Sequence, residues 1–250
     1  MSAAGLTIRV AAAALLATFL VAPDLFEPLL RPLAPAGAPA VYVQSSLAEL
    51  AAIHLGLTAL ATLASAVVAL ALATFVTRPA GAEFLPLSRS LVNVGQTFPP
   101  VAVLAVMVPA VGFGEAPTLI ALFVYGLLPI FENALAGLTA TPRSVLDAAR
   151  ATGMTARQAF LEVELPLALP AILAGVRLSA VIGLATATIG STVAARTLGE
   201  VVIAGLASSN TAYVAQGAAA IAALAMLISD GFGVVERQAA RRLGPSPSAA

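Results

Sequence analysis

Residues 147–170 read DAARATGMTARQAFLEVELPLALP, a stretch that contains one glycine and ends in two Leu-Pro pairs. It carries five charged side chains, although the whole chain is 60% hydrophobic and only 10% charged. Soluble domains are roughly 25% charged, and the mean hydropathy of +1.00 here is far higher than theirs. A bilayer can cover that much apolar surface. We therefore expect an integral membrane protein with this stretch in a polar connection.

Six apolar segments are candidate membrane spans. A spanning helix needs about 20 mainly apolar residues, and the candidates are residues 10–23, 52–77, 90–112, 116–137, 172–195 and 212–234. The third contains Phe98-Pro99-Pro100, which predicts a kink or a break. The first is short and follows Arg9, so it also resembles a cleaved signal peptide, which would leave five spans. The pattern predicts an all-α polytopic membrane protein with about six transmembrane helices.

The arginines orient these spans. With both termini in the cytoplasm, ten of the twelve arginines fall on the inner side, and only Arg31 and Arg196 fall outside. This asymmetry fits the positive-inside rule.

Residues 23–47 contain five prolines and are predicted to be an extended external connection. The longest internal connection is residues 138–171, and the polar tail after residue 240 is predicted to be disordered.

The internal connection has the local signals of two short helices. Pro142 suits a helix start, Gly153 suits the position that ends a helix, and Thr155 can cap the next one. Small side chains around Gly153 would let a partner approach the backbone. The prolines of Leu165-Pro166 and Leu169-Pro170 are predicted to stop or kink the helix before the fifth span.

The spacing of this connection resembles the EAA loop of binding-protein-dependent ABC importer permeases. Asp147-Ala148-Ala149 is followed by three residues, Gly153, nine residues, Val163, one residue and Leu165-Pro166. Every interval matches the family pattern, with Asp147 in place of Glu and Val163 in place of Ile. Composition alone also allows a simpler alternative, an amphipathic loop on the inner leaflet.

The loops suggest no second soluble domain, so we expect a single permease domain, residues 1–250, and the resemblance implies the type I ABC importer permease fold. It implies that the helix pair docks on a separate ABC ATPase dimer and that a second permease copy or a paralogue completes the transporter. The ATPase-coupling residues that it implies are Ala148, Ala149, Gly153, Met154 and Thr155 for docking, with Asp147 and Pro166 fixing the helix pair.

Two further segments resemble the osmoprotectant subfamily, whose members are permeases for glycine betaine, choline and carnitine. They are residues 93–138 and 185–206, within a resemblance that covers about 52–236. Glu132 departs from the subfamily, in which a basic residue is expected. Glu132 and Asp230 lie near the inner ends of spans, and each is expected to reach the interface or to pair with an arginine. We assign no role to His54.

Substrate selection is expected to rest with another protein. Quaternary ammonium groups are held by aromatic cages, but the chain has no Trp and only three Tyr. A periplasmic or lipid-anchored substrate-binding protein would therefore supply the affinity. Candidates for a low-affinity translocation path are the polar residues of the third and fifth spans: Asn93, Gln96, Thr97, Thr186, Thr188, Ser191 and Thr192. Their hydroxyls could instead bond to helix carbonyls or pack between helices.

Several functions are excluded or disfavoured. The absence of cysteine and the single histidine leave no metal site, and the net charge of zero does not favour nucleic acid. No P-loop or catalytic motif is present, so the chain is expected to be no enzyme and to bind no cofactor, with ATP used by the partner ATPase. Alternatives are an importer of another small solute (a sulfonate, an amino acid or a thiol-betaine), an ion-driven carrier and a channel. The expected location is the bacterial inner membrane.

Overall fold

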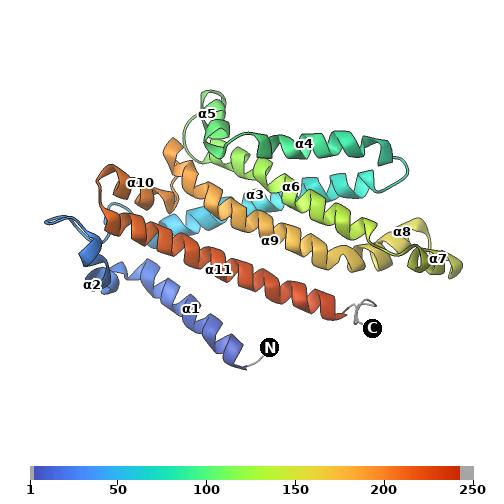
Figure 1. The fold of residues 1–250 in the computed structure, drawn as a ribbon, viewed down its shortest axis with the longest axis horizontal. Coiled ribbons are helices and arrows are strands. Elements are labelled where there is room, and N and C mark those ends of the chain that lie inside the picture. Colours follow the sequence, from blue (N-terminus) through green and yellow to red (C-terminus); the bar gives the residue numbers. More distant parts are fainter. Residues whose placement is uncertain (1–2, 243–250) are drawn as a thin grey trace. The chain divides into compact units, whose positions relative to one another are not determined.

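The computed structural model describes residues 3–242, and over that range the chain contains helices and no strands (Figure 1). The α-helices are α1 (Ala3–Val21), α2 (Glu27–Leu30), α3 (Leu47–Val76), α4 (Leu85–Thr97), α5 (Pro100–Val111), α6 (Glu115–Thr139), α7 (Arg143–Ala151), α8 (Ala156–Ala159), α9 (Leu165–Gly190), α10 (Gly199–Ala207) and α11 (Thr211–Arg242). A π-helix, Phe160–Glu164, joins α8 to α9.

The predicted spans agree with these helices. Four continuous helical segments are long and apolar enough to cross a membrane, namely Leu47–Val76, Glu115–Thr139, Ala156–Val193 and Thr211–Arg241. The other two predicted spans fall in pairs of helices that bend sharply at a short break, by 105° after α1 and by 95° between α4 and α5. Counting each bent pair as one span gives six by length and composition.

The break in the third span lies at the predicted prolines. Pro99 has an extended backbone (ψ 143°) and caps α5, and Pro100 occupies the first turn of that helix. Proline is tolerated there because the missing N–H would have no intrahelical partner. The prediction of a break at Phe98-Pro99-Pro100 is therefore confirmed.

The prediction of an extended connection over residues 23–47 is wrong for its first part. Residues 23–33 form three consecutive short helical turns, and each carries a proline in its first two positions. The prolines begin these turns instead of extending the chain, because their fixed φ suits the first helical position. Hydrogen bonds attach the later part of the connection to residues around the start of α11. Asn210 Nδ2 donates to Pro39 O at 2.8 Å, and Tyr42 N donates to Gln216 Oε1 at 2.9 Å.

The chain divides into two compact units, and each is described by itself. Unit 1 comprises residues up to 61, 98–122 and 181–228, and unit 2 comprises residues 62–97, 123–180 and those from 229 onwards. The main apolar cluster of unit 1 contains Leu16, Tyr42, Leu47, Leu50, Ala51, Leu198, Val201, Tyr213, Ala220 and Leu224.

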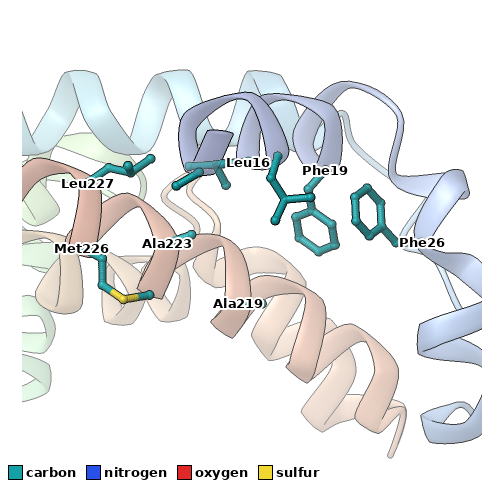
Figure 2. A pocket seen from close by; sticks show the side chains of 9 residues that line it. Leu16, Phe19, Phe26, Ala219, Ala223, Met226 and Leu227 are labelled. Atoms are coloured by element: carbon teal, nitrogen blue, oxygen red, sulfur yellow. The ribbon is translucent and has the colours of Figure 1, made fainter. Parts of the chain in front are cut away.

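Unit 1 also has an open groove between α1 and α11, with a volume of about 400 Å³ (Figure 2). Figure 2 shows Leu16, Phe19 and Phe26 on one side and residues of α11 on the other. All nine lining residues are apolar: Ala12, Leu15, Leu16, Phe19, Phe26, Ala219, Ala223, Met226 and Leu227. Such a lining has no partner for a charged or zwitterionic solute, so we do not assign the groove to transport.

The core of unit 2 packs residues of α3, α4, α6 and α9 together. Its buried members are Ala69, Ala73, Val76, Val92, Ile130, Phe131, Ala134, Leu135, Leu138, Ala168 and Ile172. Glycines bring the backbones of α6 and α9 close: a Cβ added at Gly175 would lie 2.8 Å from Pro129 O, and one at Gly137 would lie 3.0 Å from Ala171 Cβ. Close helix contact through small residues is typical of membrane proteins. It fixes the start of α9, and with it the position of the helix pair.

Of the stop or kink predicted at the Leu-Pro pairs, the stop does not occur. Pro166 and Pro170 lie inside α9, which continues from α8 through the π-helix without a break. In the π-helix the N–H of Leu165 bonds to Phe160 O, five residues earlier. Because hydrogen bonds here reach five residues back instead of four, the regular α-helical bond that Pro166 cannot donate is not required. The proline is therefore tolerated. The second short helix and the fifth span are therefore one continuous helical segment.

Candidate functional site

The helix pair of residues 143–159 begins and ends as its local sequence predicts. Pro142 is the N-cap of α7, and Gly153 follows the C-cap of that helix with a φ of +84°. The N–H of Gly153 bonds to Arg150 O at 2.9 Å, and the N–H of Met154 bonds to Ala149 O at 3.2 Å. These two bonds form a Schellman motif, in which glycine is favoured because other residues are strained at positive φ.

The start of α8 is fixed by a reciprocal cap. Thr155 is extended (φ −65°, ψ 159°), and its Oγ1 accepts from the N–H of Gln158 at 3.3 Å. The side chain of Gln158 accepts from the N–H of Thr155 at 2.9 Å. This capping box confirms the predicted cap and makes the turn between α7 and α8 a defined structure.

Most of the predicted docking residues lie on an open surface. Ala148, Gly153 and Thr155 are exposed, and Met154 is half-buried. A Cβ added at Gly153 would meet no atom within 4 Å. Ala149 differs, because it is 7% exposed and faces the protein. The backbone at Gly153 is thus open, as close approach of a partner requires.

The two residues predicted to fix the helix pair lie apart from the turn. Asp147 is paired with Arg150 of its own helix at 3.2 Å, and the two side chains are 70% and 74% exposed. Pro166 lies in the first turn of α9. Within residues 3–242, neither forms a side-chain hydrogen bond or ion pair across the turn, and their role stays a prediction.

The sequence reasoning missed a contact at the base of the helix pair. Glu164, the last residue of the π-helix, is 8% exposed. Arg78, just after α3, donates from Nη1 to Glu164 Oε1 at 3.0 Å and from Nη2 to the other carboxylate oxygen. Its guanidinium carbon lies 5.0 Å from the centre of the Phe160 ring. The available signal was an acid in the apolar run FLEVELPL and one arginine directly after a span.

The candidate path residues of α4 belong to unit 2. Asn93, Gln96 and Thr97 are all exposed. Gln96 Nε2 donates to Tyr125 O at 3.2 Å, while Thr97 Oγ1 donates to Val94 O of its own helix at 2.7 Å. These three polar side chains therefore share a short stretch of surface at the end of α4.

The other path candidates belong to unit 1, at the end of α9. Thr188 bonds back to Leu184 O at 3.2 Å, and Thr192 bonds back to Ile189 O at 2.7 Å. Ser191 Oγ donates to Ala195 O at 2.9 Å, and Thr186 is 6% exposed. The hydroxyl-to-carbonyl bonding that the sequence left open thus occurs at several of these positions, which lowers the polarity they offer to a solute.

The ionisable residues of the spans have mixed outcomes. Glu132 pairs with Arg89 through both carboxylate oxygens, at 2.9 and 3.2 Å, so the predicted arginine pairing is confirmed. Asp230 is half-buried in α11. His54, to which the sequence assigned no role, is fully buried in α3, and its Nε2 lies 3.0 Å from Leu184 O of α9. His54 therefore joins two helices of unit 1.

A polar cluster on the loop before α3 was also missed. The hydroxyls of Tyr42 and Ser45 donate to the same oxygen of Glu200, Oε1, at 2.8 and 2.7 Å. Burial, followed by the hydrogen bond to Glu200, raises the pKa of Tyr42 to about 12. The Tyr42 and Tyr213 rings pack edge to face at 5.3 Å. The cluster attaches the proline-rich connection to α10 and α11.

Solved structures identify the fold. The MetNI methionine ABC transporter in an inward-facing conformation matches with a TM-score of 0.69 and 22% identity, covering 77% of this chain and 95% of that one. An amino acid ABC transporter matches with a TM-score of 0.60 and 20% identity, covering 78% and 92%. The fold is that of a type I ABC importer permease, as the sequence predicts.

The family follows from sequence. Residues 86–235 match the model of the binding-protein-dependent transport system inner membrane component. The osmoprotectant import permease protein OsmY of Salmonella typhimurium is 38% identical over 151 residues, which cover 60% of this chain and 64% of that relative. The glycine betaine/carnitine/choline permease protein OpuCB of Bacillus subtilis is 34% identical over 188 residues, which cover 74% and 84%. The match spans less than two thirds of OsmY. The chain belongs to the family of binding-protein-dependent inner membrane transport components.

Proposed function

We propose that the chain is the permease subunit of an ATP-driven importer for osmoprotectants of the quaternary ammonium type, such as glycine betaine, choline and carnitine. The substrate class rests on the names of relatives that are 34–38% identical. The ATP-driven mechanism rests on one structural observation, the capped and exposed helix pair of α7 and α8, which continues into a span. ATP is hydrolysed by a separate ABC ATPase dimer, and this chain binds no cofactor.

Coupling takes place at the turn between α7 and α8. Ala148, Gly153, Met154 and Thr155 dock on the ATPase, with Ala149 packed behind them. Because α8 is continuous with α9, a displacement of the docked turn moves the fifth span as a rigid body. The open space around Gly153 supports this proposal.

Selection of the solute takes place in a separate binding protein. Tyr42, Tyr125 and Tyr213, which are all the tyrosines of the chain, are between 3% and 7% exposed. Their ring faces are thus used in packing and are not available for an aromatic cage around a quaternary ammonium group. The polar residues at the ends of α4 and α9 provide a path of low affinity.

The complete transporter contains a second permease, either a copy of this chain or a paralogue, beside the ATPase dimer and a periplasmic or lipid-anchored binding protein. It lies in the bacterial inner membrane with both termini of this chain in the cytoplasm. The arginine asymmetry supports this orientation.

Uptake tests the substrate class. Cells that lack other osmoprotectant importers would express the chain with the ATPase and binding protein encoded beside it, and uptake of labelled glycine betaine and choline would be measured after an osmotic upshift. We expect uptake that depends on all three components. Uptake of a labelled amino acid or sulfonate without glycine betaine or choline would contradict the substrate class and leave the ATP-driven mechanism intact.

A further inference from the structure

We propose that Arg78 is a positioning residue for coupling: its contacts with Glu164 and Phe160 attach the base of the coupling helices to the inner end of α3. ATPase movement would then reach α3 as well as α9. This inference rests on the proposed function of the helix pair. It concerns residues outside the EAA-like spacing pattern.

The arginine holds both ends of the π-helix. Its guanidinium group donates to the two oxygens of Glu164, at the last position of that helix, and lies over the ring of Phe160, at the first position. Two-pronged arginine–carboxylate bonds fix orientation as well as distance. A π-helix is often found at functional sites, and here it is the segment through which α8 becomes α9.

Arg78 itself is attached to α3 by a tight turn. Its N–H bonds to Phe75 O at 3.1 Å, and its carbonyl accepts from Gly81 N at 3.0 Å. A Cβ at Gly81 would lie 2.2 Å from Phe75 O, so the turn packs closely against the end of α3. Arg78 Nη2 also donates to Thr77 Oγ1 at 3.3 Å. The arginine is therefore a fixed extension of a helix that spans 30 residues.

The Arg78–Glu164 ion pair is more buried than the Arg89–Glu132 pair of the same unit. The side chains of Arg78 and Glu164 are 34% and 10% exposed, against 53% and 39% for Arg89 and Glu132. Val76 and Phe160 on either side belong to or pack against the apolar cluster of unit 2. Exposed pairs contribute little, whereas removal of one partner here leaves a charge in a poorly hydrated place. Movement of the π-helix away from α3 is thus opposed.

Neutral variants of the two partners test the proposal in the assembled transporter. Arg78→Gln and Glu164→Gln would be reconstituted in liposomes with the ATPase and binding protein. Glu162→Gln is the matched control, because it removes an exposed carboxylate from the same π-helix. The measurements are the amount of ATPase that co-purifies, ATP hydrolysis with and without loaded binding protein, and glycine betaine taken up per ATP.

We expect both neutral variants to retain the ATPase but to lose stimulation by the binding protein, with uptake per ATP lower by about tenfold. Arg78→Lys keeps the positive charge but loses the paired hydrogen bonds to the two oxygens of Glu164, so its uptake per ATP should be intermediate. Glu162→Gln should match the wild type. Unchanged uptake per ATP in both neutral variants, or an equal loss in Glu162→Gln, would overturn the proposal.

The exchange variant, Arg78→Glu with Glu164→Arg, decides the matter if a single variant fails to accumulate. It restores opposite charges at the same place, so it should accumulate and recover part of the uptake. An exchange variant that accumulates without any recovery would also overturn the proposal. Failure of the wild-type chain to bind the ATPase would instead contradict the proposed function, and the co-purification measurement distinguishes the two results.

Discussion

Gly153 allows the steric and the conformational demands of the coupling turn to be separated. Its φ of +84° costs an L-residue roughly 1–2 kcal/mol, and asparagine less, because it tolerates this region best. Apart from its two chain neighbours, no residue of the described range 3–242 has an atom within 4 Å of an added Cβ. A methyl group at this position therefore has open space, and we expect larger side chains to be obstructed mainly by a docked partner.

The test compares Gly153→Ala, Gly153→Asn and Gly153→Leu. Thermal unfolding should follow strain, so that Ala and Leu lower the Tm by about 2–4 °C per kcal/mol and Asn lowers it less. ATPase association should follow size instead, with Ala least affected, Asn more and Leu most. Gly231→Leu is the control for bulk, because Gly231 also has no atom within 4 Å of its Cβ and has no positive φ.

The assay is the amount of ABC ATPase that co-purifies with each variant in detergent, together with uptake and membrane insertion. We expect all variants to insert in the membrane, since the strain is small beside the stability of a folded domain. Full ATPase association and uptake in Gly153→Leu would refute the reasoning. An association that follows the Tm instead of the side-chain size would refute the steric part of it.

Three further outcomes follow from local contacts. Thr155→Ala removes the cap of α8 that Gln158 completes, which costs about 1 kcal/mol, or about a fivefold faster hydrogen exchange of the amides at the start of this helix. Burial and the bond to Glu200 raise the pKa of Tyr42 from 10.0 to about 12. Because the pKa of Tyr42 is higher in the folded state than in the unfolded state, the contribution of Tyr42 to stability is complete below pH 10 and is lost as the pH rises through about 12. Tyrosinate absorbance, compared with that of Tyr42→Phe, measures this titration. Gly199→Ala would place a Cβ 2.0 Å from a backbone oxygen, so we expect it to lower the free energy of unfolding by about 1–3 kcal/mol, seen as a lower Tm.

Each of these outcomes has a matched control. Thr97→Ala removes a hydroxyl that donates to Val94 O of its own helix, and it should not change hydrogen exchange in α8. Tyr213→Phe should not remove the titration near pH 12. Gly56→Ala adds a Cβ with no atom within 4 Å, and its Tm should stay near the wild-type value. Equal effects in test and control variants would contradict the assigned contacts.

The coupling turn was predictable because its signals are local. The positive φ at Gly153 and the cap at Thr155 depend on residues within one turn of the chain, and both were correctly inferred. Phe98-Pro99-Pro100 is similar, since two prolines constrain their own backbone.

Other features depended on register and on distant partners. The helical rule for proline gave the wrong result at Pro166, because the π-helix shifts the bonding pattern by one residue. Arg78 and Glu164 are 86 residues apart, and no spacing pattern connects them. The prolines of residues 23–33 could begin helices or extend the chain, and the sequence does not distinguish these outcomes.

The most direct test of the central claim is photo-crosslinking from the coupling turn. The chain has no native cysteine, so Ala148→Cys and Thr155→Cys can each carry a benzophenone, with Ser209→Cys on the segment between α10 and α11 as the control. In the assembled transporter we predict adducts with the ABC ATPase from positions 148 and 155 and none from position 209. The absence of ATPase adducts from both positions of the turn, in a complex that retains the ATPase, would contradict the account.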